Sequence, residues 1–273
     1  MQNESVKKEP RARQAKPVDT KAMRAFYDRV YAAGEYPLHS PEVVEAAVWS
    51  RVAQIPRHQM VLDVGCGAGP LRTCHPGYIG LDLSHSALRH FAGRRLCADA
   101  SALPLRDRAI GAVASITTIE HLCEPVRFLL EADRVLLSGG ILIISAGWLV
   151  SRWTAFGLRS RPWHDCSWAD RLRKLCLLLI SPKPVRAIAI IPRRAFRELE
   201  FLLRRRQTWR LRYRHLRPNT SRLLESDSDA AVSIDPHEVL LWLRSRDYQV
   251  ERAGSLFSRL LFRGTILARK PSP

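Results

Sequence analysis

The sequence lacks the usual marks of metal-binding, secreted and membrane-spanning proteins. None of its six cysteines forms a C-x-x-C pair or lies near histidines at zinc-ligand spacing, so we expect free thiols and no metal. Its longest apolar runs, LCLLLI and AIAII, fall far short of the ~20 residues that span a membrane. Residues 1–18 have no apolar core of a secretory signal and are predicted to be a disordered tail. We therefore expect a cytoplasmic protein in a reducing compartment.

Acidic residues are also scarce, with 26 Asp and Glu against 44 Lys and Arg, a formal net charge of +18. The excess is concentrated in residues 151–220, which hold 18 Lys and Arg but only 4 Asp and Glu. Five of the seven tryptophans lie between Trp148 and Trp209. Basic amphipathic helices with tryptophan suit a membrane surface, and arginine beside aromatic residues also suits RNA or an anionic ligand. A solvated basic face explains the same pattern, so the partner of this segment stays open.

The rest of the chain alternates between two hydrophobic periods. Four short apolar runs are typical of buried strands, and they lie at residues 60–65, 78–84, 109–117 and 140–146. Helical patterns lie between them, and this alternation predicts an α/β fold with a doubly wound, parallel sheet. The pattern breaks near Trp148 and returns with a capped amphipathic helix at residues 235–246.

These breaks divide the chain after its tail into three parts. Residues 19–147 would form the core with its N-terminal helices, and residues 148–232 a basic, tryptophan-rich helical insertion. Residues 233–270 would add the helix and strands that complete the core. An insertion at this point lies over the carboxyl ends of a parallel sheet, where ligands bind, so we expect it to cover the ligand site.

The segment VLDVGCGAGP places three glycines at alternate positions directly after an apolar run. A glycine-rich turn between a strand and a helix lets a ligand approach the backbone without meeting a Cβ. The P-loop pattern is absent, and the dinucleotide pattern G-x-G-x-x-G fails because Pro70 occupies its last position. The pattern present is D-x-G-x-G-x-G, in which Asp63 is followed by Gly65, Gly67 and Gly69.

This loop and the segments after it resemble the Rossmann-like (class I) S-adenosylmethionine-dependent methyltransferases of the small-molecule type, with a type 11 domain. The later segments are YIGLDLS with Asp82, ADASALPLRD with Asp99, AVASITTIEHL and EADRVLLSGGILIIS. The resemblance covers about Met60 to Ala146. It implies a mostly parallel seven-stranded sheet with an antiparallel last strand, S-adenosyl-L-methionine as cofactor, and a small-molecule methyl acceptor.

The resemblance also implies roles for individual residues. Asp82 would accept hydrogen bonds from the ribose hydroxyls, and Asp99 would accept one from the adenine amino group. The bare loop would lie against the methionine part of the cofactor. The full expected set of cofactor-binding residues is Asp63, Gly65, Cys66, Gly67, Gly69, Asp82, Leu83, Asp99, Ala100 and Glu120.

Two features depart from the family pattern. The stretch from Gly69 to Asp82 is short, so the first helix after the loop is expected to span only a turn or two. Gly111 stands before the fourth strand, where the family often has an acidic residue. Neither difference removes a residue that the resemblance assigns to the cofactor.

The acceptor is less well defined than the cofactor. His121, in TTIEHL, is the one titratable group there suited to act as a catalytic base near neutral pH, although helix packing is the favoured explanation for it. The sequence lacks both the (N/D)-P-P-(Y/F) motif of nucleic-acid amino-methyltransferases and a Pro-Cys pair, which favours a small acceptor, including an anionic, glycan- or lipid-linked one. An RNA methyltransferase using the arginine-rich segment and a non-catalytic cofactor-binding protein remain alternatives. Three tyrosines could cover the cofactor: Tyr27, Tyr31 and Tyr36.

Overall fold

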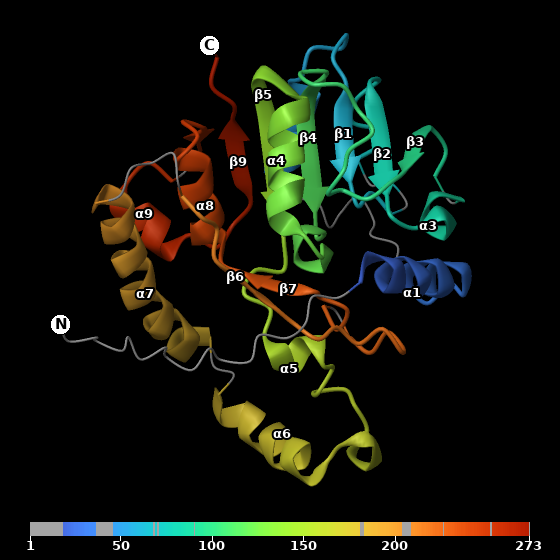
Figure 1. Cartoon of the computed structure of the whole chain (residues 1–273), viewed down its shortest axis with the longest axis vertical. Coiled ribbons are helices and arrows are strands. Elements are labelled where there is room, and N and C mark those ends of the chain that lie inside the picture. The colour runs from blue at the N-terminus through green and yellow to red at the C-terminus, as the bar shows by residue number, and fades with distance from the viewer. Residues whose placement is uncertain are drawn as a thin grey trace, which may run out of the picture.

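The computed structural model describes residues 19–36, 46–67, 69, 71–89, 91–180, 183–203, 209–225, 227–251 and 253–272. The predicted tail lies outside these residues. A seven-stranded sheet forms the centre of the molecule, and the segment between β5 and α8 extends beyond one end of it (Figure 1). The expected α/β fold with a doubly wound sheet is confirmed.

The strands of the large sheet run in the order β3-β2-β1-β4-β5-β9-β8. The first five are parallel, and β9 is antiparallel to both β5 and β8, as expected. Val64 pairs with Leu81 and with Ser115, so the carboxyl ends of the three central strands meet at one edge of the sheet. The strand bounds are β1 Val61–Val64, β2 Tyr78–Asp82, β3 Arg94–Cys97, β4 Ile110–Ile116, β5 Leu136–Ser145, β8 Gln249–Val250 and β9 Ile266–Arg269.

Both faces of the sheet are covered, which explains why its central strands are mostly apolar rather than alternating between apolar and polar residues. On one face the core includes α4 (Pro125–Val135) and α8 (Pro236–Arg244), whose Phe128 and Trp242 are almost fully buried. On the other face α2 (Ala46–Ala53) packs against the sheet. Burial from both sides fixes the strands whose ends form the site.

The first helix, α1 (Thr20–Ala32), crosses below the ends of β1 and β2 (Figure 1). Its Asp28 accepts hydrogen bonds from the Ser84 hydroxyl (2.8 Å) and the Ser86 amide (3.1 Å), next to α3 (His85–Arg89). α1 is thereby held over the carboxyl edge of the sheet. Between β1 and β2 the described residues form turns rather than a helix, consistent with the short gap in the sequence.

The segment after β5 is mostly helical but ends in a small second sheet. It contains α5 (Arg152–Ala155), α6 (Trp168–Ile180) and α7 (Lys183–Leu203). The two strands, β6 (Tyr213–His215) and β7 (Val232–Ile234), pair antiparallel and were not expected from the sequence. None of the helices in the described part of the chain has the length and apolarity needed to cross a membrane.

α7 is attached to the core by buried ion pairs. Arg194 lies 2.7 Å from Asp235, the N-cap of α8, and Arg197 lies 2.6 Å from Glu238 on the same helix. All four side chains are at most 4% exposed. Part of the arginine excess therefore lies inside the protein, where each charge needs a partner because desolvation is costly.

Candidate active site

A pocket lies where β1, β2 and β4 end and α1 crosses them. Open α/β sheets bind their ligands at this position. Most of the predicted site residues line it: Asp63, Gly65, Cys66, Gly67, Asp82, Leu83, Asp99, Ala100 and His121. Gly69 and Glu120 are not among the described residues that line it.

The glycine loop after β1 is shaped by close packing at two of its glycines. Gly65 has φ +73°, and a Cβ there would lie 2.3 Å from the side chain of Thr118, so the pocket wall admits only bare backbone. Gly69 also has φ +73°, but its missing Cβ would meet the Phe91 ring at 2.2 Å. Gly69 therefore serves the packing of the loop rather than the surface of the pocket.

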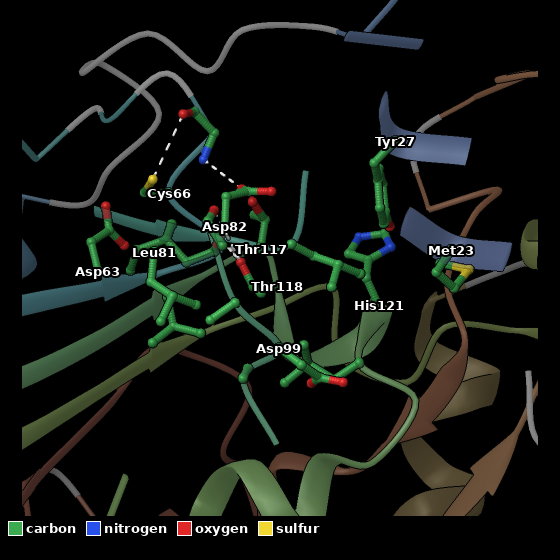
Figure 2. Close-up of a pocket in the computed structure, with 18 of the residues that line it drawn as sticks. Met23, Tyr27, Asp63, Cys66, Leu81, Asp82, Asp99, Thr117, Thr118 and His121 are labelled. Atoms are coloured by element: carbon green, nitrogen blue, oxygen red, sulfur yellow. Dashed lines mark hydrogen bonds between the residues drawn. The ribbon is translucent and has the colours of Figure 1, made fainter. Parts of the chain in front are cut away.

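Asp82 joins the loop to the end of β2. It is 8% exposed, and its carboxylate accepts a hydrogen bond from the Gly67 amide (2.9 Å) (Figure 2). It accepts a second hydrogen bond from the Ser84 amide (2.8 Å). Burial raises the pKa of Asp82, while these backbone hydrogen bonds lower it. One amide contacts each carboxylate oxygen, so each oxygen can still accept a further bond from a ligand hydroxyl.

Asp63 lies at the other side of the loop, away from His121 (Figure 2). It is 2% exposed and accepts a hydrogen bond of 2.5 Å from the Tyr78 hydroxyl. Burial raises its pKa to about 7, and the charge of Asp82 adds to this although the Tyr78 bond opposes it. A cationic ligand group placed near Asp63 would favour its ionised form.

Asp99 and Ala100 form the wall below the end of β3. Asp99 accepts a hydrogen bond from the Ser101 amide (2.8 Å), which fixes the turn, and Ala100 is 5% exposed. Cys66 lies in the loop itself, and burial raises the pKa of its thiol. This thiol is therefore protonated and acts as a small apolar wall group rather than as a nucleophile.

Three tyrosines close the pocket on the side of α1. Tyr27, Tyr31 and Tyr36 all line it. The hydroxyls of Tyr27 and Tyr36 donate to the same oxygen of Asp229, at 2.9 Å and 3.4 Å. Burial raises the pKa of Tyr27, so this hydroxyl stays protonated and remains a donor. The sequence did not point to Asp229, because it lies far along the chain in a stretch without a motif.

His121 lies next to Tyr27 at one end of the pocket, with ring centres 6.4 Å apart (Figure 2). Its Nδ1 is 3.3 Å from an oxygen of Asp229. Burial lowers the pKa of His121, but the charges of Asp229, Glu120 and Asp227 outweigh it and raise the pKa overall. The ring is therefore more protonated at neutral pH than a free imidazole, which makes it a poor acceptor of a proton.

Glu120 is not among the described residues that line the pocket, although the sequence analysis expected it in the cofactor site. It is 1% exposed, and its Oε1 accepts a hydrogen bond of 2.5 Å from the Gly147 amide. Its backbone carbonyl accepts from the Ala231 amide (2.9 Å), next to β7. Glu120 thus contacts the inserted segment rather than the cofactor pocket.

Comparison with known proteins supports this picture. A family model described as a methyltransferase domain matches residues 62–144. A protein of Mycobacterium tuberculosis (strain CDC 1551 / Oshkosh) named "Probable S-adenosylmethionine-dependent methyltransferase" is 33% identical over 107 residues, which cover 36% of this chain and 39% of that protein. A similarly named protein of Mycolicibacterium smegmatis is 31% identical over 107 residues, covering 36% and 42%. The chain thus matches about two fifths of the length of these relatives.

Solved structures of low sequence identity are also similar to the chain. A Bacillus halodurans chain, crystallised as a candidate methyltransferase, is 15% identical with a TM-score of 0.44 and covers 83% of this chain and 98% of its own. A Haemonchus contortus phosphoethanolamine N-methyltransferase with bound S-adenosylhomocysteine is 21% identical, with a TM-score of 0.40 and coverage of 45% and 35%. Sheet order, glycine loop and family match agree: residues 62–144 form a methyltransferase domain of the Rossmann-like, class I, S-adenosylmethionine-dependent type.

Proposed function

We propose that this protein transfers a methyl group from S-adenosylmethionine to a small-molecule acceptor held at a membrane surface. The observation that supports it most directly is the position of Asp82. Its carboxylate is fixed by the Gly67 and Ser84 amides and faces the same pocket as the bare backbone of Gly65. A carboxylate suits the paired hydroxyls of a ribose, and the bare loop suits the close approach of the amino-acid end.

S-adenosylmethionine supplies an electrophilic methyl group on a sulfonium. Because that leaving group is already good, the protein contributes mainly by holding the two reactants in line. Asp82 and Asp99 would fix the adenosine end, while Asp63 would balance the positive charge of the amino-acid end. Tyr27 and Tyr36 would exclude water at the acceptor end. The raised pKa of His121 argues against a role for it as the catalytic base.

The activity can be tested with purified protein, methyl-labelled S-adenosylmethionine and separate lipid, small-molecule and RNA fractions of cell extract. We expect label in a lipid-soluble acceptor. Label in RNA instead would favour the alternative of an RNA methyltransferase. Cofactor binding without transfer to any fraction would favour the non-catalytic alternative, and failure to bind the cofactor would contradict the proposal as a whole.

The exposed face of α6 favours delivery of the acceptor from a membrane surface. Trp168, Leu172 and Leu175 follow one another at helical spacing and are 74%, 50% and 58% exposed. Arg171 and Arg173 lie exposed between them. A helix with exposed aromatic and aliphatic groups and flanking arginines suits the interface of an anionic membrane, where the apolar groups insert and the arginines meet lipid phosphates.

Replacing Trp168 with alanine is expected to weaken sedimentation with anionic phospholipid vesicles about tenfold, because an inserted tryptophan contributes on the order of 1–2 kcal/mol. Neutral vesicles and high salt are expected to reduce binding of the wild type as well. Phe257→Ala on α9 (Leu256–Leu261) is the matched control, since Phe257 is 73% exposed but lies outside residues 151–220. Equal effects of the two substitutions, or no vesicle binding, would contradict docking through α6.

A further inference from the structure

A compact group of potential metal ligands lies beside the pocket, behind His121. Glu120, His121 and Asp227 each place one ligand atom within 4.8 Å of the others. Glu120 and His121 belong to η2 (Ile119–His121), the short 3₁₀ helix directly after β4. Asp227 lies before β7, near the end of the inserted segment. A divalent ion can contact three atoms at such separations simultaneously.

One buried atom of this group has no hydrogen-bond partner among the described residues. It is Oε2 of Glu120, a residue that is 1% exposed. Buried polar atoms are nearly always paired, so this orphan atom needs an explanation. Among the described residues, His121 is the one cationic side chain found in an ion pair with Asp229, and no ion pair reaches Glu120 or Asp227. The group therefore holds more negative charge than the protein balances.

Gly147 lies next to both carboxylates of the group, and its lack of a side chain leaves room for them. Gly147 does not have a positive φ, so its own backbone does not require glycine. A Cβ at this position would lie 2.9 Å from Asp227 Oδ1 and 3.0 Å from Glu120 Oε1. An added methyl group at this position would therefore press on both carboxylates, which converge on the same point.

We propose that Glu120, His121 and Asp227 bind one divalent cation, which links the inserted segment to the methyltransferase core. Two carboxylates and one imidazole suit Mn²⁺ or Zn²⁺, which bind both oxygen and nitrogen ligands. They suit Mg²⁺ or Ca²⁺ less well, because these ions prefer oxygen ligands alone. A cationic methyl acceptor bound in the pocket could not balance the charge of the two carboxylates. Of the three residues, His121 lines the pocket, whereas Glu120 and Asp227 are not among its described lining residues. This site could not be predicted from the sequence, because Asp227 is distant along the chain from the other two residues and no metal-binding spacing is present.

The test uses the untagged full chain, freed of metal by dialysis against a chelator and titrated with Mn²⁺. Loss of the free Mn²⁺ signal in electron paramagnetic resonance measures uptake, and we expect one ion per chain. Asp227→Asn and Glu120→Gln are each expected to weaken binding by at least about tenfold. Gly147→Ala should weaken it as well, because the added methyl group collides with both carboxylates. Asp107→Asn, at an acidic side chain that is 73% exposed, is the control and should bind as the wild type does.

A second measurement covers variants that fold poorly. Saturating Mn²⁺ should raise the melting temperature of the wild type and of Asp107→Asn, because only the folded chain forms the site. Absence of uptake by the wild type, or uptake that Asp227→Asn and Glu120→Gln both leave unchanged, would overturn the proposal. Binding of S-adenosylmethionine to the metal-free chain tests the proposed function separately, so failure of one does not imply failure of the other.

Discussion

Replacing Asp82 with alanine is expected to weaken binding of S-adenosylmethionine about a hundredfold. Two hydrogen bonds from ribose hydroxyls to a carboxylate would be lost, and bonds to a charged group contribute roughly 1.5–3 kcal/mol each. About 2.7 kcal/mol corresponds to a hundredfold change in Kd. The substitution also removes the acceptor of the Gly67 and Ser84 amides, so the loop that carries Gly65 would lose its anchor.

Isothermal titration calorimetry of three variants would separate these effects. Asp82→Asn keeps one acceptor oxygen and the shape of the side chain, so we expect an affinity between those of Asp82→Ala and the wild type. Asp107→Asn should leave the affinity unchanged, because its side chain is exposed and paired with Arg134. An Asp82→Ala protein that folds and binds the cofactor as tightly as the wild type would show that Asp82 does not contact it.

Replacing Glu198 with glutamine is expected to lower the free energy of unfolding by about 3–5 kcal/mol. Glu198 is 3% exposed and lies at the centre of a buried ion network on α7. It accepts hydrogen bonds from His237 (3.1 Å), Arg244 (3.1 Å) and Arg259 (2.7 Å). Removing the charge of one member leaves buried cations without a counterion, which is the costly case for internal ion pairs.

Thermal unfolding would measure this loss. We expect the midpoint temperature to fall by about 10 °C, since each kcal/mol shifts it by roughly 2–4 °C in a chain of this size. Glu251→Gln is the matched control: Glu251 pairs with Arg51 at the surface, with side chains 40% and 31% exposed. Such exposed pairs contribute at most about 1 kcal/mol. Equal shifts in the two variants would contradict a special role for the buried network.

The stability difference between the wild type and Glu198→Gln is expected to depend on pH. Burial alone would raise the pKa of Glu198, but the hydrogen bonds from His237 and Arg259 outweigh it and hold the pKa below its usual range. The stabilisation is then complete above the unfolded pKa of about 4.3, and it is lost as the pH falls through the lower folded value. The difference between wild type and Glu198→Gln should therefore be full at pH 7 and shrink in acid.

The sequence predicted the sheet well because its strands are buried on both faces. A short, mostly apolar run bounded by turns, such as Val61–Val64 or Ile110–Ile116, is typical of a buried strand. Asp82 and the glycines before it could be identified because each follows a strand at a fixed point of the fold. The pairing of β6 with β7 could not be predicted from the sequence, because two three-residue strands leave almost no periodic pattern.

In the arginine-rich segment, composition does not show which arginines are exposed and which are buried. Its net charge predicted a solvated face or an anionic partner, and the exposed Arg171 and Arg173 fit that description. Arg194 and Arg197 do not, because each lies inside the protein opposite an acidic side chain of α8. A helical pattern identifies two faces but not which face another element covers. Asp227 and Asp229 could not be assigned to the site in advance either, because they lie in a turn far along the chain, in a stretch without a motif.

The buried pairs between α7 and α8 also determine how this segment can be exchanged between relatives. A chimera that replaced residues 148–232 alone would bring new partners for Asp235 and Glu238, which remain behind in the recipient. Unless the donor supplied arginines at matching points, two acidic groups would be stranded in the interior and the hybrid would be unstable. Residues 148–232 can therefore be exchanged between relatives only together with the first two turns of α8.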